Sequence, residues 1–530
     1  MNIYLIGMCA AMAVFLVISL LVSRKVRDAE DFYVAGRRAP TSLIAGSIIA
    51  SYIGVGLFMG DAAESFEGMF APILILAVMQ TAGYIIGSVF FGRYLRRSKA
   101  LTIPEFFGER FCSRKMRTLS AITAIVMMSV YLLSVMQGIG TLMSLVTGVD
   151  YELCIVIALA VFTAISVISG SRGVLITDTL MALVFTLALA AASLAIAHDL
   201  GGWFPAIRQL ASDPAMSDLL SWHGRLGVLY GSGAENMVWA FSYGIVWMSL
   251  CMVGPWQSSR YQMAKNEQVI TRSGLWAALG VVLVEFLALM SGVMLNLAHP
   301  DVADPSHVMI WASMHLLPPI LGVVLLVGIL SAGISSATTF LSLIGASVAN
   351  DIVRSSGRRS ILAGRCAMIA AALAILAFAV LNPPSVFWIM YLGGAIVASS
   401  WMPVALASIL SKRVTKTGAF CGMLIGFVSC FAVKLYVSLT GVSLPVYLDP
   451  SIVGMACNVI AMAIGSALTQ VTPEEQAVRE RLLVLPEAER DPEEIKKTMH
   501  SARLARLVGL LVTVMLLVFW VIPYLRSLRT

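Results

Sequence analysis

The sequence predicts an all-α membrane protein that crosses the bilayer many times. Of its 530 residues, 59% are hydrophobic and only 12% are charged, which leaves too few polar side chains to cover a water-soluble globule of this size. The apolar residues form about fourteen stretches, each close to the ~20 residues that a helix needs to cross the hydrocarbon core. The predicted spans are 3–23, 41–60, 70–94, 117–146, 152–170, 174–199, 237–256, 270–297, 319–346, 361–381, 385–411, 416–440, 449–469 and 504–525.

The basic residues predict how these spans are oriented. Lys and Arg are concentrated between residues 93 and 117, whereas the stretch 297–319 contains neither residue type. The positive-inside rule therefore places the N-terminus outside, and an even number of crossings places the C-terminus outside as well. The first apolar stretch has no basic residues before it, so we expect a retained helix rather than a cleaved signal peptide. Further residues expected in the cytoplasm are Arg37, Arg38, Arg172, Arg260, Lys265, Arg358, Arg359, Lys412 and Arg413.

Other features of the composition argue against several functional classes. The eight cysteines are scattered singly, without the spacing of a zinc site or a disulfide framework. In a membrane protein the net charge of +7 reflects basic loops, so no nucleic-acid partner is expected. The polar segments contain no nucleophile with a general base and no phosphate-binding loop, so an enzyme is not expected. The expected partners are the lipid bilayer of the cell membrane, a small solute and ions.

Glycine and proline interrupt two of the predicted spans. Gly54 and Gly56 lie in the middle of the second span, where each glycine weakens a helix by ~1 kcal/mol relative to alanine. Gly254-Pro255 interrupts the seventh span. Irregular backbone inside a membrane is tolerated mainly where it lines a cavity. The two interruptions lie five spans apart, which is the spacing expected for transporters built from two inverted five-helix repeats.

These repeats divide the chain into further parts. The external loop at 200–236 contains tryptophan, proline and glycine, and forms either short lid helices or a packed loop. The charged segment at 472–503 begins with a helix-capping pattern and is expected to be a solvated cytoplasmic helix. The other expected parts are an extra helix with its loop at 1–40, repeats at 41–199 and 237–411, two further helices in 412–471 and a last helix at 504–530.

Hydroxyl side chains are concentrated in the ninth predicted span. Ser335, Thr338 and Thr339 share one helical face there. Their oxygens, together with carbonyls freed by a broken helix, could bind a dehydrated Na⁺ without adding negative charge. The alternative is that these hydroxyls bond back to their own helix or join neighbouring helices.

Two acidic residues lie inside predicted spans. An acidic group at membrane depth is costly, and is therefore a functional-site hypothesis by default. Asp178 follows Gly170–Thr177 in the sixth span, where it either belongs to a site or pairs with Arg172. Glu285 lies midway along the eighth span, and the sequence does not fix which face it occupies. A substrate site and a proton relay both stay open for Glu285.

Five motifs occur in a characteristic order along the chain. They are Asp31-Phe-Tyr-Val-Ala-Gly-Arg-Arg38, Thr102-Ile-Pro-Glu-Phe-Phe-Gly-Glu-Arg110, Gly170 to Asp178, Arg260-Tyr-Gln-Met-Ala-Lys265, and the run from Ser331 to Leu341 that leads to Asn350-Asp351. In this order the chain resembles the sodium:solute symporter family, which includes sodium/proline, sodium/galactose, sodium/sialic acid and sodium/pantothenate symporters. The resemblance extends from Asp31 to about Gln470. It implies the leucine-transporter fold, with one extra helix before the two repeats and others after them.

The family resemblance also implies two sodium sites. The main site of the family uses two carbonyls at the first helix break, and a carbonyl with two hydroxyls from the eighth core helix. These positions are Ala50 and Ile53, then Ala332, Ser335 and Ser336. Some members bind a second ion, and the matching residues are Asp178, Ser335, Thr338 and Thr339. We therefore expect two sodium ions per cycle, although Tyr52 stands where the proline transporter has an aspartate.

The solute is less closely defined by the resemblance. Gly254-Pro255, the phrase from Asn382 to Trp388 and Met79-Gln80 are nearest to the pantothenate and small-carboxylate branches. Trp256 stands where those branches have a histidine. We expect a carboxylate or a vitamin on this basis. The residues expected near the solute are Ser51, Gly54, Gln80, Tyr84, Gln137, Trp256 and Gln257, with interhelical packing as the alternative for the two aromatic ones.

The expected function is therefore sodium-coupled import of a small polar organic solute by alternating access. One alternative is a membrane sensor of the same fold, although no signalling module follows the last predicted span. Another is a proton-coupled transporter in which Asp178 or Glu285 carries the proton. Sodium-independent, pH-driven uptake would favour the latter.

Overall fold

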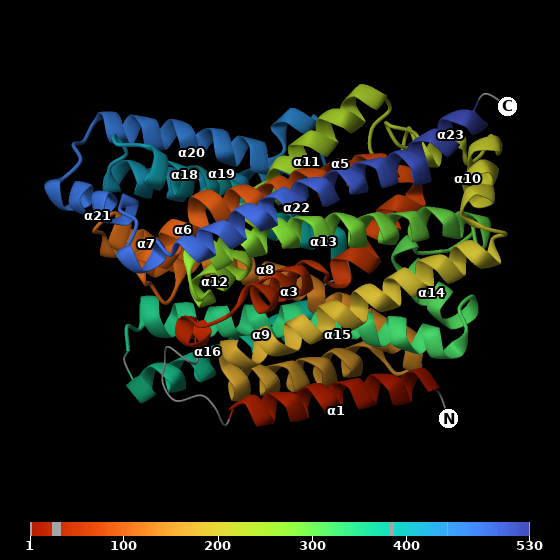
Figure 1. Ribbon diagram of the computed structural model, residues 1–530, viewed down its shortest axis with the longest axis horizontal. Coiled ribbons are helices and arrows are strands. Elements are labelled where there is room, and N and C mark those ends of the chain that lie inside the picture. The colour runs from red at the N-terminus through yellow and green to blue at the C-terminus, as the bar shows by residue number, and fades with distance from the viewer. Residues whose placement is uncertain (1–2, 24–32, 356, 382–385, 443, 529–530) are drawn as a thin grey trace.

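The computed structural model describes residues 3–23, 33–355, 357–381, 386–442 and 444–528, and every regular element in these ranges is a helix. The long helices run side by side along the molecule, and helix α1 (Ile3–Ser23) begins at the same end of the bundle at which α23 (Ile522–Ser527) ends (Figure 1). Twelve helical segments are long and apolar enough to cross a membrane. The all-α membrane fold is confirmed, whereas the count of about fourteen crossings stays a prediction.

In the first half of the chain, helix α3 is interrupted near Gly54, as the sequence predicts. Helix α3 ends at Tyr52, and a helical path from Leu57 to Ser98 follows. This path replaces the loop predicted between spans 41–60 and 70–94, because the chain turns at one residue, Gly68, with φ of 108°. The other helices of this half are α4 (Ala62–Glu64), α5 (Phe70–Ile86), α6 (Arg93–Ser98), α7 (Ile103–Arg110), α8 (Arg114–Thr147) and α9 (Tyr151–Asp199), with α3 beginning at Thr41.

Two candidate membrane spans, Tyr151–Ile168 and Leu175–Asp199, lie within α9 and match the predicted spans 152–170 and 174–199. The side chains of residues 169–174, including Arg172, lie outside the described part of the structure.

The second half of the chain packs directly against the first. Helix α15 lies along α9, α11 lies along α5, and α13 contacts both α3 and α5. Residues far apart in the sequence are therefore neighbours inside the bundle. The helices of this half are α10 (Trp203–Ser212), α11 (Gly233–Val253), α12 (Pro255–Met263), α13 (Glu267–Met294), α14 (Val308–His315), α15 (Pro319–Ala346), α16 (Gly357–Leu381), α17 (Val386–Ile396), α18 (Met402–Leu410), α19 (Lys416–Thr440), α20 (Pro450–Ala467), α21 (Pro473–Leu483) and α22 (Pro492–Leu516).

The loop between α9 and α11 contains a short helix rather than only irregular chain. Helix α10 lies at the end of the bundle that also holds α14 and α23 (Figure 1). Trp203 at its start donates a hydrogen bond from Nε1 to the carbonyl of Phe519, 2.8 Å away, and its ring packs against Phe286. This part of the loop is therefore packed onto α13 and the C-terminal helix.

A second interruption separates α11 from α12 at Gly254. Its backbone adopts φ −55° and ψ 137°, and the following Pro255 starts the new helix. A Cβ at Gly254 would lie 2.4 Å from the carbonyl oxygen of Leu250. The close approach to the preceding turn therefore leaves no room for a side chain, which explains glycine at the break.

We expect Gly254→Ala to lower the free energy of unfolding by about 1–3 kcal/mol, because the added methyl group must displace backbone. The measurement is the apparent melting temperature of the purified protein in detergent. Gly231→Ala is the matched control, since a Cβ there meets no heavy atom within 4 Å. Equal melting temperatures for the two variants would contradict the packing explanation of the break.

Candidate functional site

The interruption of α3 changes which backbone groups are hydrogen-bonded. The N–H of Gly54 donates to the carbonyl of Tyr52 at 2.8 Å, and the N–H of Leu57 donates to the carbonyl of Gly54 at 3.2 Å. In a continuous helix these two donors would bond to Ala50 and Ile53 instead. The carbonyls of Ala50 and Ile53 therefore lose their regular helical donors in the middle of the bundle.

Helix α15 presents its hydroxyl groups to this interruption. Ser335 and Ser336 are buried, with exposed fractions of 1% and 2%, and Ala332 one turn earlier is buried as well. A Cβ at Gly54 would lie 3.5 Å from Oγ of Ser336. The five residues that the family resemblance assigns to the main sodium site therefore lie on two elements that face each other.

Thr338 behaves differently from the serines of the same helix. Its hydroxyl donates to the carbonyls of Ile334 and Ser335, at 2.8 Å and 3.1 Å. This is the bonding to the helix's own backbone that the sequence left open as an alternative.

Asp178 lies between the first and second halves of the chain. Its Oδ2 accepts hydrogen bonds from Ser47 at 2.6 Å and from Arg260 at 3.0 Å, and its Oδ1 accepts one from Ser335 at 2.6 Å. Asp178 therefore faces the hydroxyl-bearing helix. Pairing with Arg172 lies outside the described side chains, whereas the ion pair with Arg260 is present.

Arg260 is a basic residue that lies inside the bundle. The positive-inside rule places it in the cytoplasm, but its side chain is buried with an exposed fraction of 2%. Besides Asp178, it donates to Ser47 and Thr339 at 3.0 Å each, and to the carbonyl of Trp256. The guanidinium therefore occupies the space between residues that the resemblance assigns to a second sodium ion. The adjacent cavity has a volume of about 10 Å³, roughly the room of one water molecule.

A polar chain connects the two helix interruptions. Ser51 donates to Oε1 of Gln257 at 3.1 Å, and Nε2 of Gln257 donates to the hydroxyl of Tyr84 at 3.2 Å. Gln80, one turn before Tyr84, is buried, and its Oε1 has no partner among the described residues. These four expected solute residues therefore lie in one region, beside Gly54.

The other two expected solute residues are less directly connected with that region. Trp256 is fully buried and packs against Tyr131 and Phe340, with ring centroids 4.8 Å and 5.1 Å away. Gln137 is buried on α8. The next residue, Gly138, packs against Val55, which follows the interruption of α3. These ring contacts fit the interhelical packing that the sequence left open as the alternative for Trp256, and its expected place near the solute stays a prediction.

Two features of the site were not expected from the sequence. The hydroxyl of Tyr52 donates to Glu285 at 2.6 Å, which gives Glu285 a position on the inner face of α13. Asp61 is a second buried carboxylate near that pair, at an exposed fraction of 5%. Because 61 falls just beyond the predicted span 41–60, sequence reasoning placed Asp61 in a loop. The recurrence of acids at Asp61, Glu64 and Glu67 is the signal that could have indicated it.

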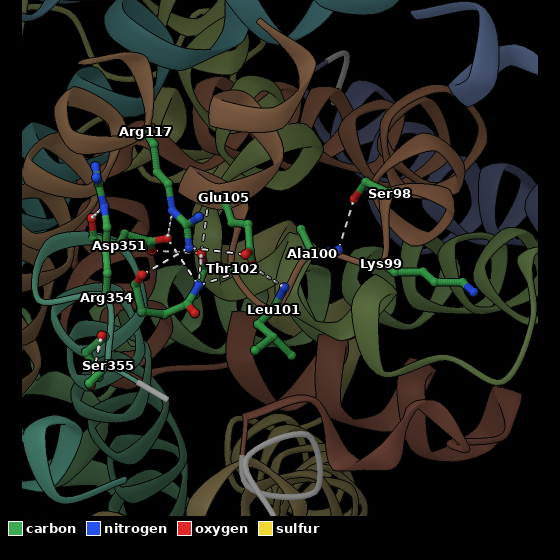
Figure 2. A network of polar contacts seen from close by, with 12 residues as sticks. Ser98, Lys99, Ala100, Leu101, Thr102, Glu105, Arg117, Asp351, Arg354 and Ser355 are labelled. Atoms are coloured by element: carbon green, nitrogen blue, oxygen red, sulfur yellow. Dashed lines mark hydrogen bonds and ion pairs between the residues drawn. The ribbon is translucent and has the colours of Figure 1, made fainter. Parts of the chain in front are cut away.

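Two of the sequence motifs meet at the opposite end of the bundle from α14. Thr102 donates to Asp351 at 2.7 Å, and Arg117 bonds both to Asp351 at 2.8 Å and to Glu105 at 3.1 Å (Figure 2). Asn350 donates to Glu105 at 3.1 Å. The network joins the starts of α7 and α8 to Asn350 and Asp351, which follow α15.

Comparison with known proteins assigns the chain to a family. The model of the sodium:solute symporter family matches residues 32–426. The chain belongs to this family. A high-affinity proline transporter of Bacillus subtilis is 23% identical over 86% of this chain and 96% of its own length. A sodium/pantothenate symporter of Haemophilus influenzae is 22% identical over 83% of this chain and 90% of its own length.

The likeness extends to solved structures. The substrate-bound, outward-open structure of a sodium-coupled sialic acid symporter superposes with a TM-score of 0.73, at 17% identity. It covers 89% of this chain and 99% of the other. The leucine-transporter fold expected from the motifs is therefore confirmed, and this symporter-family member is a multi-pass membrane protein.

The buried pair of Asp178 and Arg260 generates a stability prediction. We expect Asp178→Asn or Arg260→Gln alone to lower the free energy of unfolding by about 3–5 kcal/mol, because each leaves one buried charge without its partner. The double variant should lose much less than the sum of the two. The measurement is a double-mutant cycle on apparent melting temperatures in detergent. Strictly additive losses would show that the two charges do not stabilise each other.

Proposed function

We propose that this protein is a sodium-coupled symporter that imports a small polar organic solute by alternating access. The observation that carries the proposal is the interruption of α3 opposite the hydroxyl groups of α15. Carbonyl and hydroxyl oxygens are hard donors that suit Na⁺, and they add no net charge at membrane depth. The proposed ligands are the carbonyl oxygens of Ala50, Ile53 and Ala332 and the hydroxyl groups of Ser335 and Ser336.

The proposed coupling follows from where these ligands reside. Ala50 and Ile53 belong to the first repeat, whereas Ala332, Ser335 and Ser336 belong to the second. An ion shared between them stabilises the conformation in which both sets of oxygens converge, and raises affinity for a solute that binds the same conformation. Entry of one positive charge supplies ~2.3 kcal/mol per 100 mV of membrane potential, in addition to the concentration gradient.

The proposed solute site is the region beside the α3 interruption. Ser51, Gln80, Tyr84 and Gln257 supply its polar groups, and Gly54 leaves room for the solute to approach the backbone. Gln137 and Trp256 form its surroundings. This arrangement supports a solute that is held by a few directional hydrogen bonds inside an apolar bundle.

We propose that the basic end of the bundle faces the cytoplasm, so that both chain ends lie outside. The loop before the first repeat contacts the second repeat at that end, where the N–H of Ala39 donates to the carbonyl of Met263 at 3.1 Å and the N–H of Lys265 donates to the carbonyl of Ala39 at 3.0 Å. At the opposite end lies a cavity of about 450 Å³. A closed basic end and a hollowed opposite end support an outward-facing conformation.

A proton-coupled version of the same mechanism is the second candidate. Asp178 is an unfavourable proton carrier because three donors already bind its carboxylate. Glu285 accepts only the hydrogen bond from Tyr52 among the described residues, so it is the better candidate. Sodium-dependent stabilisation of the protein separates sodium coupling from this alternative and from a sensor that binds no ion.

The main site is tested by sodium titration of the melting temperature of the purified protein, with choline chloride keeping the ionic strength constant. We expect Ser336→Ala to raise the half-saturating sodium concentration about ten- to a hundredfold, because a lost ligand to a charge is worth ~1.5–3 kcal/mol. Ser331→Ala is the control, since its hydroxyl bonds to Val327 in its own helix at 2.6 Å. An unchanged titration for Ser336→Ala would contradict the site. Solutes that stabilise the protein only with sodium would then be tested by counterflow in liposomes.

The number of ions is tested by the slope of the same titration. We propose that Arg260 supplies the positive charge at Asp178, so that one sodium ion binds instead of the two expected from the resemblance. We therefore expect a Hill slope of about one in the wild type. Arg260→Ala should raise the slope above one, because it frees Asp178, Ser335 and Thr339 to bind a second ion. A wild-type slope near two would contradict the role of Arg260 and support two ions.

A further inference from the structure

Two buried carboxylates beside the proposed solute site lack a positive partner. Glu285 is fully buried and Asp61 has an exposed fraction of 5%. Among the described residues, Oε1 of Glu285 and Oδ1 of Asp61 have no hydrogen-bond partner. Asp61 ends the helical segment Leu57–Asp61, which packs against α13, the helix that contains Glu285. Burying such groups as unpaired anions is costly, so each is neutralised by a proton or by a bound cation.

The remaining buried carboxylates show that this chain normally pairs such groups. Each of the following has an Arg or Lys nitrogen within 4 Å: Asp178, Glu267, Asp351 and Glu475. Within the described part of the chain no ion pair involves Asp61, Glu64 or Glu285. The unpaired carboxylates are therefore confined to the region between the solute site and the cavity described next.

An acidic path leads from the 450 Å³ cavity to this pair. The cavity is lined in part by Glu64, Glu67 and Asp304, and Glu64 and Glu67 follow Asp61 at successive intervals of three residues. Residues three apart lie on neighbouring positions of a helical surface. The only basic group lining the cavity in the described structure is the imidazole of His307, which lies 3.5 Å from Asp304. A cation entering the cavity thus meets carboxyl oxygens at every stage.

Aromatic rings complete the surroundings of the carboxylates. Tyr52, the donor to Glu285, packs edge-on against Tyr84 with ring centroids 6.4 Å apart. Tyr131 is buried on α8, and its ring packs against Trp256. Aromatic faces next to carboxylates suit ammonium and guanidinium groups. In the described residues no three His, Cys, Asp or Glu side chains converge closely enough to hold a metal ion.

We propose that the solute is an organic cation whose ammonium or guanidinium group binds between Asp61 and Glu285. This inference rests on the proposed function and names its substrate class. It replaces the carboxylate or vitamin expected from the nearest family branches, because a carboxylate would meet two buried negative charges here. Ser51, Gln80 and Gln257 remain available for the polar part of the same molecule.

The test is a thermal-shift titration of the full-length purified protein in sodium chloride. The cationic probes are putrescine, agmatine, arginine and choline, and the comparison probes are proline, pantothenate and N-acetylneuraminate. We expect stabilisation by at least one cationic probe and by none of the comparison probes. Asp61→Asn and Glu285→Gln should each weaken that binding at least tenfold, while the stabilisation by sodium alone is retained. Glu152→Gln, at an exposed position of α9, is the control and should bind as the wild type does.

Two outcomes would overturn the inference. One is stabilisation by a neutral or anionic probe that Asp61→Asn and Glu285→Gln leave unchanged. The other is that sodium stabilises the protein but none of the cationic probes does. Loss of the sodium response in the wild type is a different result, because it contradicts the proposed function itself.

Discussion

A backbone carbonyl at membrane depth must find a donor or a cation, and this constraint organises the centre of the molecule. The turn at Ile53 and Gly54 redirects two N–H groups, so the carbonyls of Ala50 and Ile53 lose the donors of a regular helix. The adjacent α15 offers hydroxyl groups, of which that of Ser336 lies close to Gly54. The two interrupted helices are held in register by the bonds from Ser51 through Gln257 to Tyr84. The interruption thus creates both the proposed ion site and the open backbone beside the proposed solute site.

The buried carboxyl groups around this interruption differ in whether they have a positively charged partner. Asp178 is neutralised within the chain by Arg260 and is saturated with hydrogen bonds, which makes it a fixed structural link between repeats. Asp61 and Glu285 have no such partner in the described structure. The same low dielectric that makes an unpaired charge costly also makes it an effective recognition group for a ligand of opposite sign. We infer that the first arrangement serves stability and that the second serves binding.

Much of this organisation follows from local sequence features, because a glycine or a helical spacing of hydroxyl residues determines the structure of its own segment. Gly54 and Gly254 interrupt their helices as predicted, and the periodicity of Ser335 places its hydroxyl on the face of α15 that contacts Asp178. The turn at Gly68 was missed because one glycine with positive φ replaces a whole loop. The burial of Arg260 was missed because hydropathy patterns count charges along a segment and do not detect a buried partner on another helix. Contacts between distant segments, such as Tyr52 with Glu285, have no local signature.

The central claim is that sodium binds where the interrupted α3 faces α15. The most direct measurement is a pair of structures determined by cryo-electron microscopy, one in sodium chloride and one in N-methylglucamine chloride. We expect density for an ion in sodium only, enclosed by the carbonyl oxygens of Ala50, Ile53 and Ala332 and the hydroxyl groups of Ser335 and Ser336. Identical maps in the two salts, or an ion bound elsewhere while Ala50 and Ile53 regain helical donors, would contradict the claim.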